Sequence, residues 1–112
     1  MSKPVEIIKD AKILRIQILH RRIDGENYIL NALLEGDYFS SEVSLVELDF
    51  ENVEYLNSLG ITEFINIHRK FNASNPESVE FKFINVDAHI YGILELVEMH
   101  KIAEIILKKS EG

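Results

Sequence analysis

The side chain best suited to regulated chemistry is the hydroxyl of Ser58, which lies in the segment 57–60, Asn-Ser-Leu-Gly. A strand-like apolar pattern that ends near Asp49 precedes this segment, and a helical pattern follows it. The serine is therefore expected in the first turn of a helix, where backbone N–H groups lack partners within the helix. A phosphate added there would meet the positive end of the helix dipole. The spacing predicts a position that tolerates serine phosphorylation.

The neighbours of Ser58 have separate expected roles. Asn57 is predicted to cap the helix, because asparagine accepts hydrogen bonds at a helix start about as well as aspartate does. Leu59 is expected to face the core rather than a partner. Gly60 has no Cβ and is expected to allow a backbone or a partner to approach closely.

Two carboxylates, Asp24 and Asp49, follow apolar segments. Asp24 is predicted to cap the first helix, and Asp49 to end a strand. A carboxylate pair raises the alternatives of acid–base catalysis and a magnesium site. The sequence offers no accompanying nucleophile, histidine partner or glycine-rich phosphate loop, so we predict that the protein is not an enzyme. Arg21 and Arg22 are interpreted as part of a solvated face.

The histidines give no metal-binding pattern, because no two of them are three or four residues apart. Cysteine is absent, which excludes thiolate ligands and fits a reducing compartment. We therefore predict no metal and no cofactor. The four histidines are His20, His68, His89 and His100.

The bulk composition indicates one folded domain over residues 1–112, with 46% apolar and 28% charged residues. The net charge of −7 disfavours nucleic acid and anionic membranes, both of which recruit basic proteins. It is compatible with a protein partner that has a basic face. No apolar run follows the first residues, so no signal peptide is expected, and no run approaches the roughly 18 residues of a membrane span. These features predict a cytoplasmic protein.

Hydrophobic periodicity predicts the element order β-β-α-β-α-β-α-β. The first two strands are expected to pair antiparallel around a turn at residues 10–12, and the later strands to be parallel because helices connect them. Strands are expected at residues 4–8, 13–19, 43–50, 79–83 and 103–107. Helical stripes are expected at Tyr28, Ile29, Leu33 and Leu34, at Ile61, Phe64, Ile65, Ile67 and Phe71, and at Ile90, Ile93, Leu94 and Val97 after a cap at Asp87. The predicted core contains Ile16, Ile18, Leu48, Phe64, Phe83 and Leu94.

The segment 46–60 resembles the signature of the STAS domain, the family of bacterial anti-sigma-factor antagonists. That signature is an apolar strand, an Asp, a short turn, an apolar pair, and then Asp-Ser-Ser/Thr-Gly at the start of a helix. Asp49, Ser58 and Gly60 match it. Asn57 replaces the second Asp, and Leu59 replaces the second hydroxyl residue.

The resemblance extends beyond the signature, through residues 22–24 at the end of the second strand and residues 93–102 around the third helix. It implies a single-domain α/β STAS-like fold with a mostly parallel central sheet, an antiparallel N-terminal strand, and helices packed on the sheet. Only residues 108–112 follow the last expected strand, so the family's C-terminal helix is expected to be short or absent.

The resemblance also implies a regulatory binding protein that works by partner switching. When Ser58 is unphosphorylated, the chain is expected to bind an anti-sigma factor that is a serine kinase of the histidine-kinase-like ATPase type. Phosphorylation of Ser58 would release this partner, and a serine phosphatase would reverse the change. The expected partner-binding residues are Asp24, Asn57, Ser58, Leu59, Gly60, Glu63 and Asn66.

Three points remain open. The chain could be a non-switching STAS-like structural subunit of a signalling scaffold or of a lipid-transport assembly, in which the serine is not modified. Asn57 has two interpretations, since it either lessens charge repulsion beside a phosphate or reflects relaxed kinase recognition. A weak nucleotide contact, as in some STAS proteins, is a further alternative.

Overall fold

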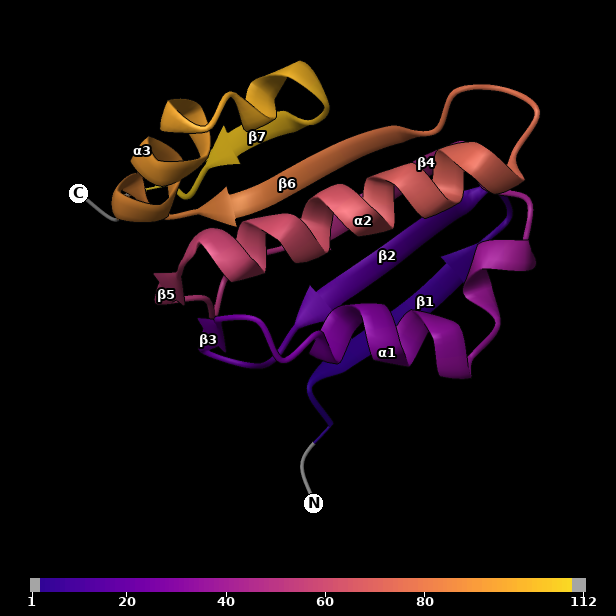
Figure 1. The fold of residues 1–112 in the computed structure, drawn as a ribbon, viewed down its shortest axis with the longest axis horizontal. Coiled ribbons are helices and arrows are strands. Elements are labelled where there is room, and N and C mark those ends of the chain that lie inside the picture. Colours follow the sequence, from indigo (N-terminus) through magenta and orange to yellow (C-terminus); the bar gives the residue numbers. More distant parts are fainter. Residues whose placement is uncertain (1–2, 110–112) are drawn as a thin grey trace.

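The computed structural model describes residues 3–109 and shows a five-stranded sheet with three helices (Figure 1). The strand order is β1-β2-β4-β6-β7, with β1 antiparallel to β2 and all other neighbours parallel. The strands are β1 (Val5–Asp10), β2 (Ile13–Ile18), β4 (Leu45–Asp49), β6 (Glu80–Val86) and β7 (Glu104–Leu107). The helices are α1 (Tyr28–Glu35), α2 (Ser58–Ser74) and α3 (Ala88–Leu96), with the 3-10 turns η1 (Tyr38–Ser40) and η2 (Met99–Lys101).

A short parallel ribbon, separate from the sheet, pairs β3 (Arg22–Ile23) with β5 (Tyr55–Leu56). The sequence pattern does not predict this ribbon, because two-residue strands are too short to show a period of two. The ribbon lies next to the start of α2 (Figure 1).

The hairpin between β1 and β2 follows from a tight two-residue turn. Asp10 pairs with Ile13, so only Ala11 and Lys12 form the loop. Ala11 has a φ of 54°, which is the left-handed conformation that two-residue hairpin turns use. The predicted turn and the antiparallel pairing are confirmed.

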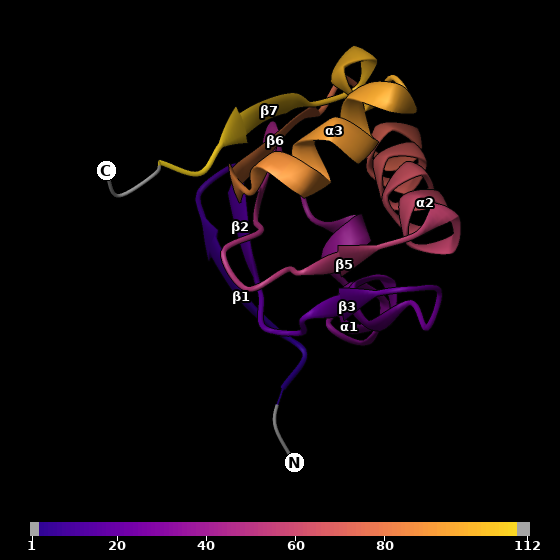
Figure 2. The same ribbon diagram turned by 90° about the vertical axis from the view of Figure 1, so that its left-hand side faces the viewer.

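All three helices lie on one face of the sheet (Figure 2). The strands alternate accordingly, and in β2 the side chains of Leu14, Ile16 and Ile18 are buried whereas Arg15 is exposed. On the helix side, Phe50, Phe64 and Phe83 form an aromatic cluster with ring centroids 4.9–5.4 Å apart. This cluster ties α2 to the middle of the sheet.

The opposite face of the sheet carries a row of alternating charges. Arg15, Glu47, Lys82 and Glu104 are successive cross-strand neighbours. Opposite charges that face each other across strands stabilise a sheet modestly, and Arg15 Nε lies 3.8 Å from Glu47 Oε1. This row replaces a second helical layer with a solvated surface.

The predicted α/β fold and the type of each long element are confirmed. All six predicted core residues are buried. Three residues assigned to helical stripes differ, because Leu34 on α1 and Ile65 on α2 are exposed and Val97 lies just beyond the end of α3. Residues 108–109 have no regular structure, and the rest of the tail expected to lack a long helix lies outside the described residues. None of the helices within residues 3–109 has the length and apolar character needed to cross a membrane.

Leu48 tests the strand assignment, because its side chain is fully buried in the central strand β4. We expect Leu48→Ala to lower the free energy of unfolding by about 2–5 kcal/mol, as buried leucine truncations generally do. The matched control is Leu96→Ala, since Leu96 is 85% exposed at the end of α3, and it should change stability by less than about 0.5 kcal/mol. Urea denaturation measures both, and equal effects of the two substitutions would contradict the fold.

Candidate functional site

Ser58 is the first residue of α2, and its side chain is exposed. The preceding residue, Asn57, has an extended backbone, and its Oδ1 accepts hydrogen bonds from the N–H groups of Leu59 at 3.1 Å and Gly60 at 3.0 Å. The predicted capping role of Asn57 is therefore confirmed. Because the neighbouring amide supplies the cap, the hydroxyl of Ser58 is left out of it.

Gly60 marks a close approach of two backbone segments. A Cβ added at this position would lie 2.2 Å from the carbonyl oxygen of Ile23, a distance that real Cβ atoms essentially never show. The N–H of Asn57 also donates to this carbonyl at 3.3 Å. The expected close backbone approach at Gly60 is confirmed, and it places β3 directly beside the start of α2.

The ribbon of β3 and β5 presents a polar cluster on its outer side. Ile23 and Leu56 pair across the ribbon and are buried, whereas their neighbours Arg22 and Tyr55 pair on the exposed side. The guanidinium of Arg22 lies 4.0 Å from the centroid of the Tyr55 ring, and its Nε lies 3.2 Å from Asp24 Oδ2. Arg22 was expected only as part of a solvated face, and no role was expected for Tyr55, because their contact depends on the unpredicted ribbon.

Asp24 does not cap the first helix, so that prediction is wrong. Helix α1 begins at Tyr28, and the capping position is Asn27, whose φ is 58° and whose side chain makes no capping hydrogen bond. Asp24 lies too far upstream to reach the free N–H groups of the first turn, and it pairs with Arg22 instead.

Leu59 does not face the core, so that prediction is also wrong. Its side chain is 61% exposed, because position 59 lies outside the buried stripe of α2. A Cβ added to Gly25 would lie only 2.8 Å from the Cβ of Leu59. The loop that contains Asp24 therefore passes beside the first turn of α2. We call the group Arg22, Asp24, Tyr55, Ser58 and Leu59 the Ser58 rim.

Glu63 was expected to bind a partner, which requires an exposed side chain, and the structure contradicts this. The residue is 2% exposed, and its Oε2 accepts hydrogen bonds from the N–H groups of Ile29 at 2.9 Å and Leu30 at 3.0 Å. These are two of the free N–H groups at the start of α1. A carboxylate from α2 thus caps α1 in place of a local side chain, and it cannot contact a partner. Asn66, the remaining expected contact, is half-buried on the same helix.

Burial raises the pKa of the Glu63 carboxyl above its ordinary value, and the hydrogen bonds from Leu30 and Ile29, which favour the ionised form, offset only part of this rise. A carboxyl of this kind binds more protons in the folded state than in the unfolded state. Its contribution to stability is therefore fully present below the unfolded-state pKa and is lost as the pH rises through the raised pKa.

Two further titratable residues, Asp49 and His68, make structural contacts. Asp49 Oδ1 accepts from the N–H of Glu51 at 2.9 Å and from Asn85 Nδ2 at 3.0 Å, which fixes the end of β4. The ring of His68 packs on Phe81 at a centroid distance of 5.0 Å, and burial lowers its pKa. Within residues 3–109, no group of three or more histidine, aspartate or glutamate side chains is arranged to hold a metal ion.

No model of a known protein family matches the sequence, and no curated protein matches it. Solved structures do match, and the class that they define is that of the anti-sigma-factor antagonists. The chain has the STAS-domain fold of this class, as its sequence predicted.

Three of these structures illustrate the similarity. A candidate anti-sigma-factor antagonist from Thermotoga maritima has a TM-score of 0.64 and 14% identity over 91% of this chain and 85% of its own. The unphosphorylated form of the anti-sigma-factor antagonist SpoIIAA has a TM-score of 0.64 and 13% identity, over 96% and 90%. The phosphorylated form of SpoIIAA, described as a Bacillus cell fate determinant, has a TM-score of 0.61 and 12% identity, over 96% and 92%. Identities this low establish the shared fold alone.

The capping role of Glu63 predicts a distinctive response to pH. We expect Glu63→Ala to be strongly destabilising, because it leaves the N–H groups of Ile29 and Leu30 without their partner, at about 1–3 kcal/mol for each buried unpaired group.

Glu63→Gln keeps an acceptor but does not titrate. Its free energy of unfolding relative to wild type should rise as the pH increases from the ordinary carboxyl range through the raised pKa of Glu63, since only the wild type loses stability as Glu63 ionises. Urea denaturation across this range measures the difference, and parallel pH curves would contradict the account.

Proposed function

We propose that the chain is a regulatory protein that binds an anti-sigma factor through the Ser58 rim and is released from it by phosphorylation of Ser58. The observation that carries this proposal is the position of Ser58, exposed at the first residue of a 17-residue helix whose cap is supplied by Asn57. A kinase can reach this hydroxyl without breaking a structural hydrogen bond of the cap. The shared fold with anti-sigma-factor antagonists supports the proposal.

The magnitudes favour an effect on binding rather than on folding. A phosphoserine adds about −1.5 to −2 charges. At a helix N-terminus the dipole favours a negative charge by roughly 0.3–1 kcal/mol, so the fold tolerates the modification. In a complex, the same charge would be desolvated within the interface, and a buried unpaired charge costs about 3–5 kcal/mol. This cost corresponds to an affinity loss of roughly a hundredfold or more.

The two departures from the STAS signature fit this switch. Asn57 supplies both capping hydrogen bonds without a charge, so a phosphate on Ser58 would meet less repulsion than it would beside an aspartate. Leu59 is exposed and adds apolar surface next to the serine. The rim thus combines a modifiable hydroxyl with an apolar contact and the Arg22–Tyr55 pair.

The proposed binding partner of the chain is a serine-kinase anti-sigma factor of the histidine-kinase-like ATPase type. A serine phosphatase would reverse the phosphorylation of Ser58. Both would meet the chain in the cytoplasm. The net charge of −7 favours a partner with a basic face. The chain itself acts by binding and needs no cofactor.

A second candidate function rests on Leu59. The residue stands where the STAS signature has a second hydroxyl, and its 61% exposure makes it suitable for a lasting apolar contact. The chain would then be a constitutive subunit of a signalling scaffold or a lipid-transport assembly, bound through the same rim without phosphorylation. The two functions make opposite predictions for substitutions at Ser58.

Substitutions at Ser58 should separate binding from stability. We expect Ser58→Glu to keep the melting temperature of the wild type but to weaken binding to the purified ATPase partner by roughly a hundredfold. Ser58→Ala should bind normally and stay bound in the presence of ATP, because it cannot accept a phosphate. Ser78→Glu, at an exposed loop position, is the matched control and should bind as wild type does. Titration calorimetry with and without ATP measures these affinities.

Equal binding by all the Ser58 variants would favour the constitutive subunit. If wild type, Ser58→Ala and Ser58→Glu bind the ATPase equally and none of them receives phosphate, the switch is absent.

The Arg22–Tyr55 pair should contribute to the contact, since arginine and tyrosine are enriched among the residues that dominate interface energies. We expect Arg22→Ala and Tyr55→Ala each to weaken partner binding about fivefold to tenfold. Arg15→Ala removes an arginine and its ion pairs from the opposite face of the sheet and should leave the affinity unchanged. Surface plasmon resonance can compare the three variants. A loss of binding only for Arg15→Ala would place the interface on the solvated face of the sheet and contradict the proposal.

A further inference from the structure

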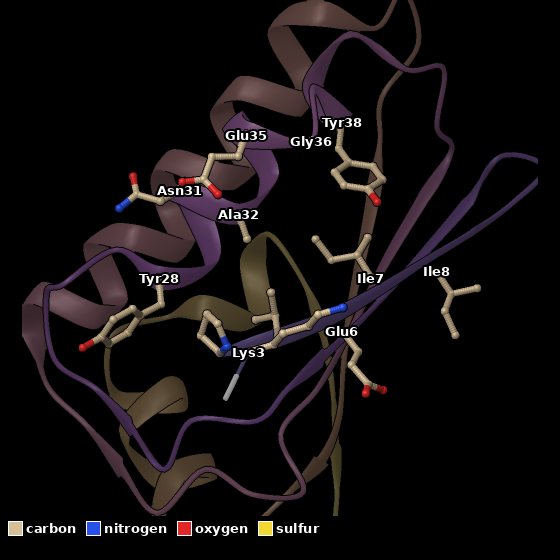
Figure 3. A pocket seen from close by; sticks show the side chains of 12 residues that line it. Lys3, Glu6, Ile7, Ile8, Tyr28, Asn31, Ala32, Glu35, Gly36 and Tyr38 are labelled. Atoms are coloured by element: carbon tan, nitrogen blue, oxygen red, sulfur yellow. The ribbon is translucent and has the colours of Figure 1, made fainter. Parts of the chain in front are cut away.

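A groove of about 880 Å³ lies between the free edge of β1 and helix α1. Figure 3 shows Ile7, Ala32 and Tyr38 pointing into the space between strand and helix, whereas Glu6 and Ile8 point away from it. In the described part of the chain, β1 is an end strand of the sheet and no other strand pairs with its outer edge. The groove is therefore bounded by an unpaired strand on one side and a helix face on the other.

The backbone groups of β1 point alternately towards β2 and towards the groove. The N–H of Leu19 donates to the carbonyl of Pro4 at 2.8 Å, which makes these two residues a hydrogen-bonded pair of the antiparallel ladder. Bonded and non-bonded pairs alternate along such a ladder. The bonded positions of β1 are thus the even-numbered ones, and the N–H and C=O groups of the residues between them point outward. These outward residues are Val5, Ile7 and Lys9.

The opposite wall is one face of α1 together with the turn that follows it. Tyr28, Ala32 and Glu35 recur at helical spacing along this face, and Tyr38 continues it from η1. On β1, Ile7 faces the same space and is partly buried. Ile7, Ala32 and Tyr38 thus supply apolar surface in the groove, and Asn31 and Glu35 line it beside them.

We propose that this groove binds an extended segment of a partner protein, which adds to β1 as a new edge strand. The unpaired edge selects an extended backbone, because a neighbouring strand supplies donors and acceptors at the alternate residues where the edge needs them. Every second side chain of the added strand then faces α1. The segment therefore carries apolar side chains at alternate positions, and the face of α1 selects among them.

The charges of β1 disfavour a second copy of this chain as the occupant. In an antiparallel pair centred on Ile7, Lys9 of one copy would lie opposite Val5 of the other. The charged end of Lys9 would then lie beside the apolar side chains of the groove. In the register centred on Glu6, Glu6 would face its own copy, and Lys9 would face Lys3. Like charges directly opposite each other destabilise a strand pair.

The groove is a site distinct from Ser58, although its end adjoins the Ser58 rim. Pro4 and Tyr28 line the groove and also line the small hollow beside Arg22 and Asp24. Ser58 lines neither. The binding of an extended segment is therefore independent of the phosphorylation switch, and the two proposals can fail separately.

The probe for this proposal is a capped heptapeptide with valine or isoleucine at every second position, threonine between them, and a lysine at each end to suit the acidic chain. We expect saturable binding in a heteronuclear NMR titration of the full chain, with shifts confined to β1 and the facing side of α1. Solvent exchange of the amides of Val5, Ile7 and Lys9 should slow on binding. The same peptide with N-methyl groups on the edge-facing amides has equal charge and should bind at least about tenfold more weakly, because it lacks those donors.

Three variants separate edge pairing from nonspecific attraction. Lys9→Pro removes one outward donor from an exposed position and should weaken peptide binding several-fold. Ala32→Arg fills the groove from α1 and should abolish binding, whereas Leu34→Arg, at an exposed α1 position outside the groove, should not. Ser58→Glu should bind the peptide as wild type does.

Four outcomes would overturn the proposal: no saturable binding of the peptide, equal binding of its N-methylated form, equal effects of Ala32→Arg and Leu34→Arg, or shifts confined to α2 and α3. Dimerisation of the chain through β1 in analytical ultracentrifugation would overturn it as well, since the edge would then be occupied by a second copy.

Discussion

The backbone contact between Gly60 and Ile23 is the constraint on which the Ser58 rim depends. Because position 60 has no Cβ, β3 can lie against the first turn of α2, and the Ile23 carbonyl can accept the N–H of Asn57. This contact brings together two segments that are more than thirty residues apart in the chain. A larger residue at position 60 would separate them and disperse the side chains that surround Ser58.

A second long-range interaction holds the scaffold behind the rim. The Glu63 carboxylate of α2 caps α1, whose own capping residue, Asn27, makes no capping hydrogen bond with its side chain. The two helices are thereby fixed to each other as well as to the sheet, where Phe64 packs on Phe83. A charge added at Ser58 therefore lies at the start of a helix that is attached to both α1 and the sheet, and we expect its main effect on partner binding rather than on the fold.

The sequence predicted the features that depend on local chemistry. The alternation in residues 13–19 indicated β2, and asparagine before a helical pattern correctly indicated the cap at Asn57. The errors lie where tertiary contacts override local preference. Aspartate is a residue type that often caps helices, but Asp24 lies too far before the start of α1 to do so. Glu63, which is distant in the sequence, accepts the hydrogen bonds of that helix start instead. Leu59 was expected inside because it is apolar, and the groove beside β1 could be recognised only once α1 was placed.

The central claim, that Ser58 is a regulatory phosphorylation site, can be tested most directly in the cells that make the protein. Phosphopeptide mass spectrometry on protein recovered under several growth conditions would report the occupancy of each serine. We predict phosphate on Ser58, at an occupancy that changes between growth conditions and is lower in the fraction of the protein that is bound to its partner. Protein that is unmodified at Ser58 under every condition, or equally phosphorylated in its free and bound fractions, would contradict it.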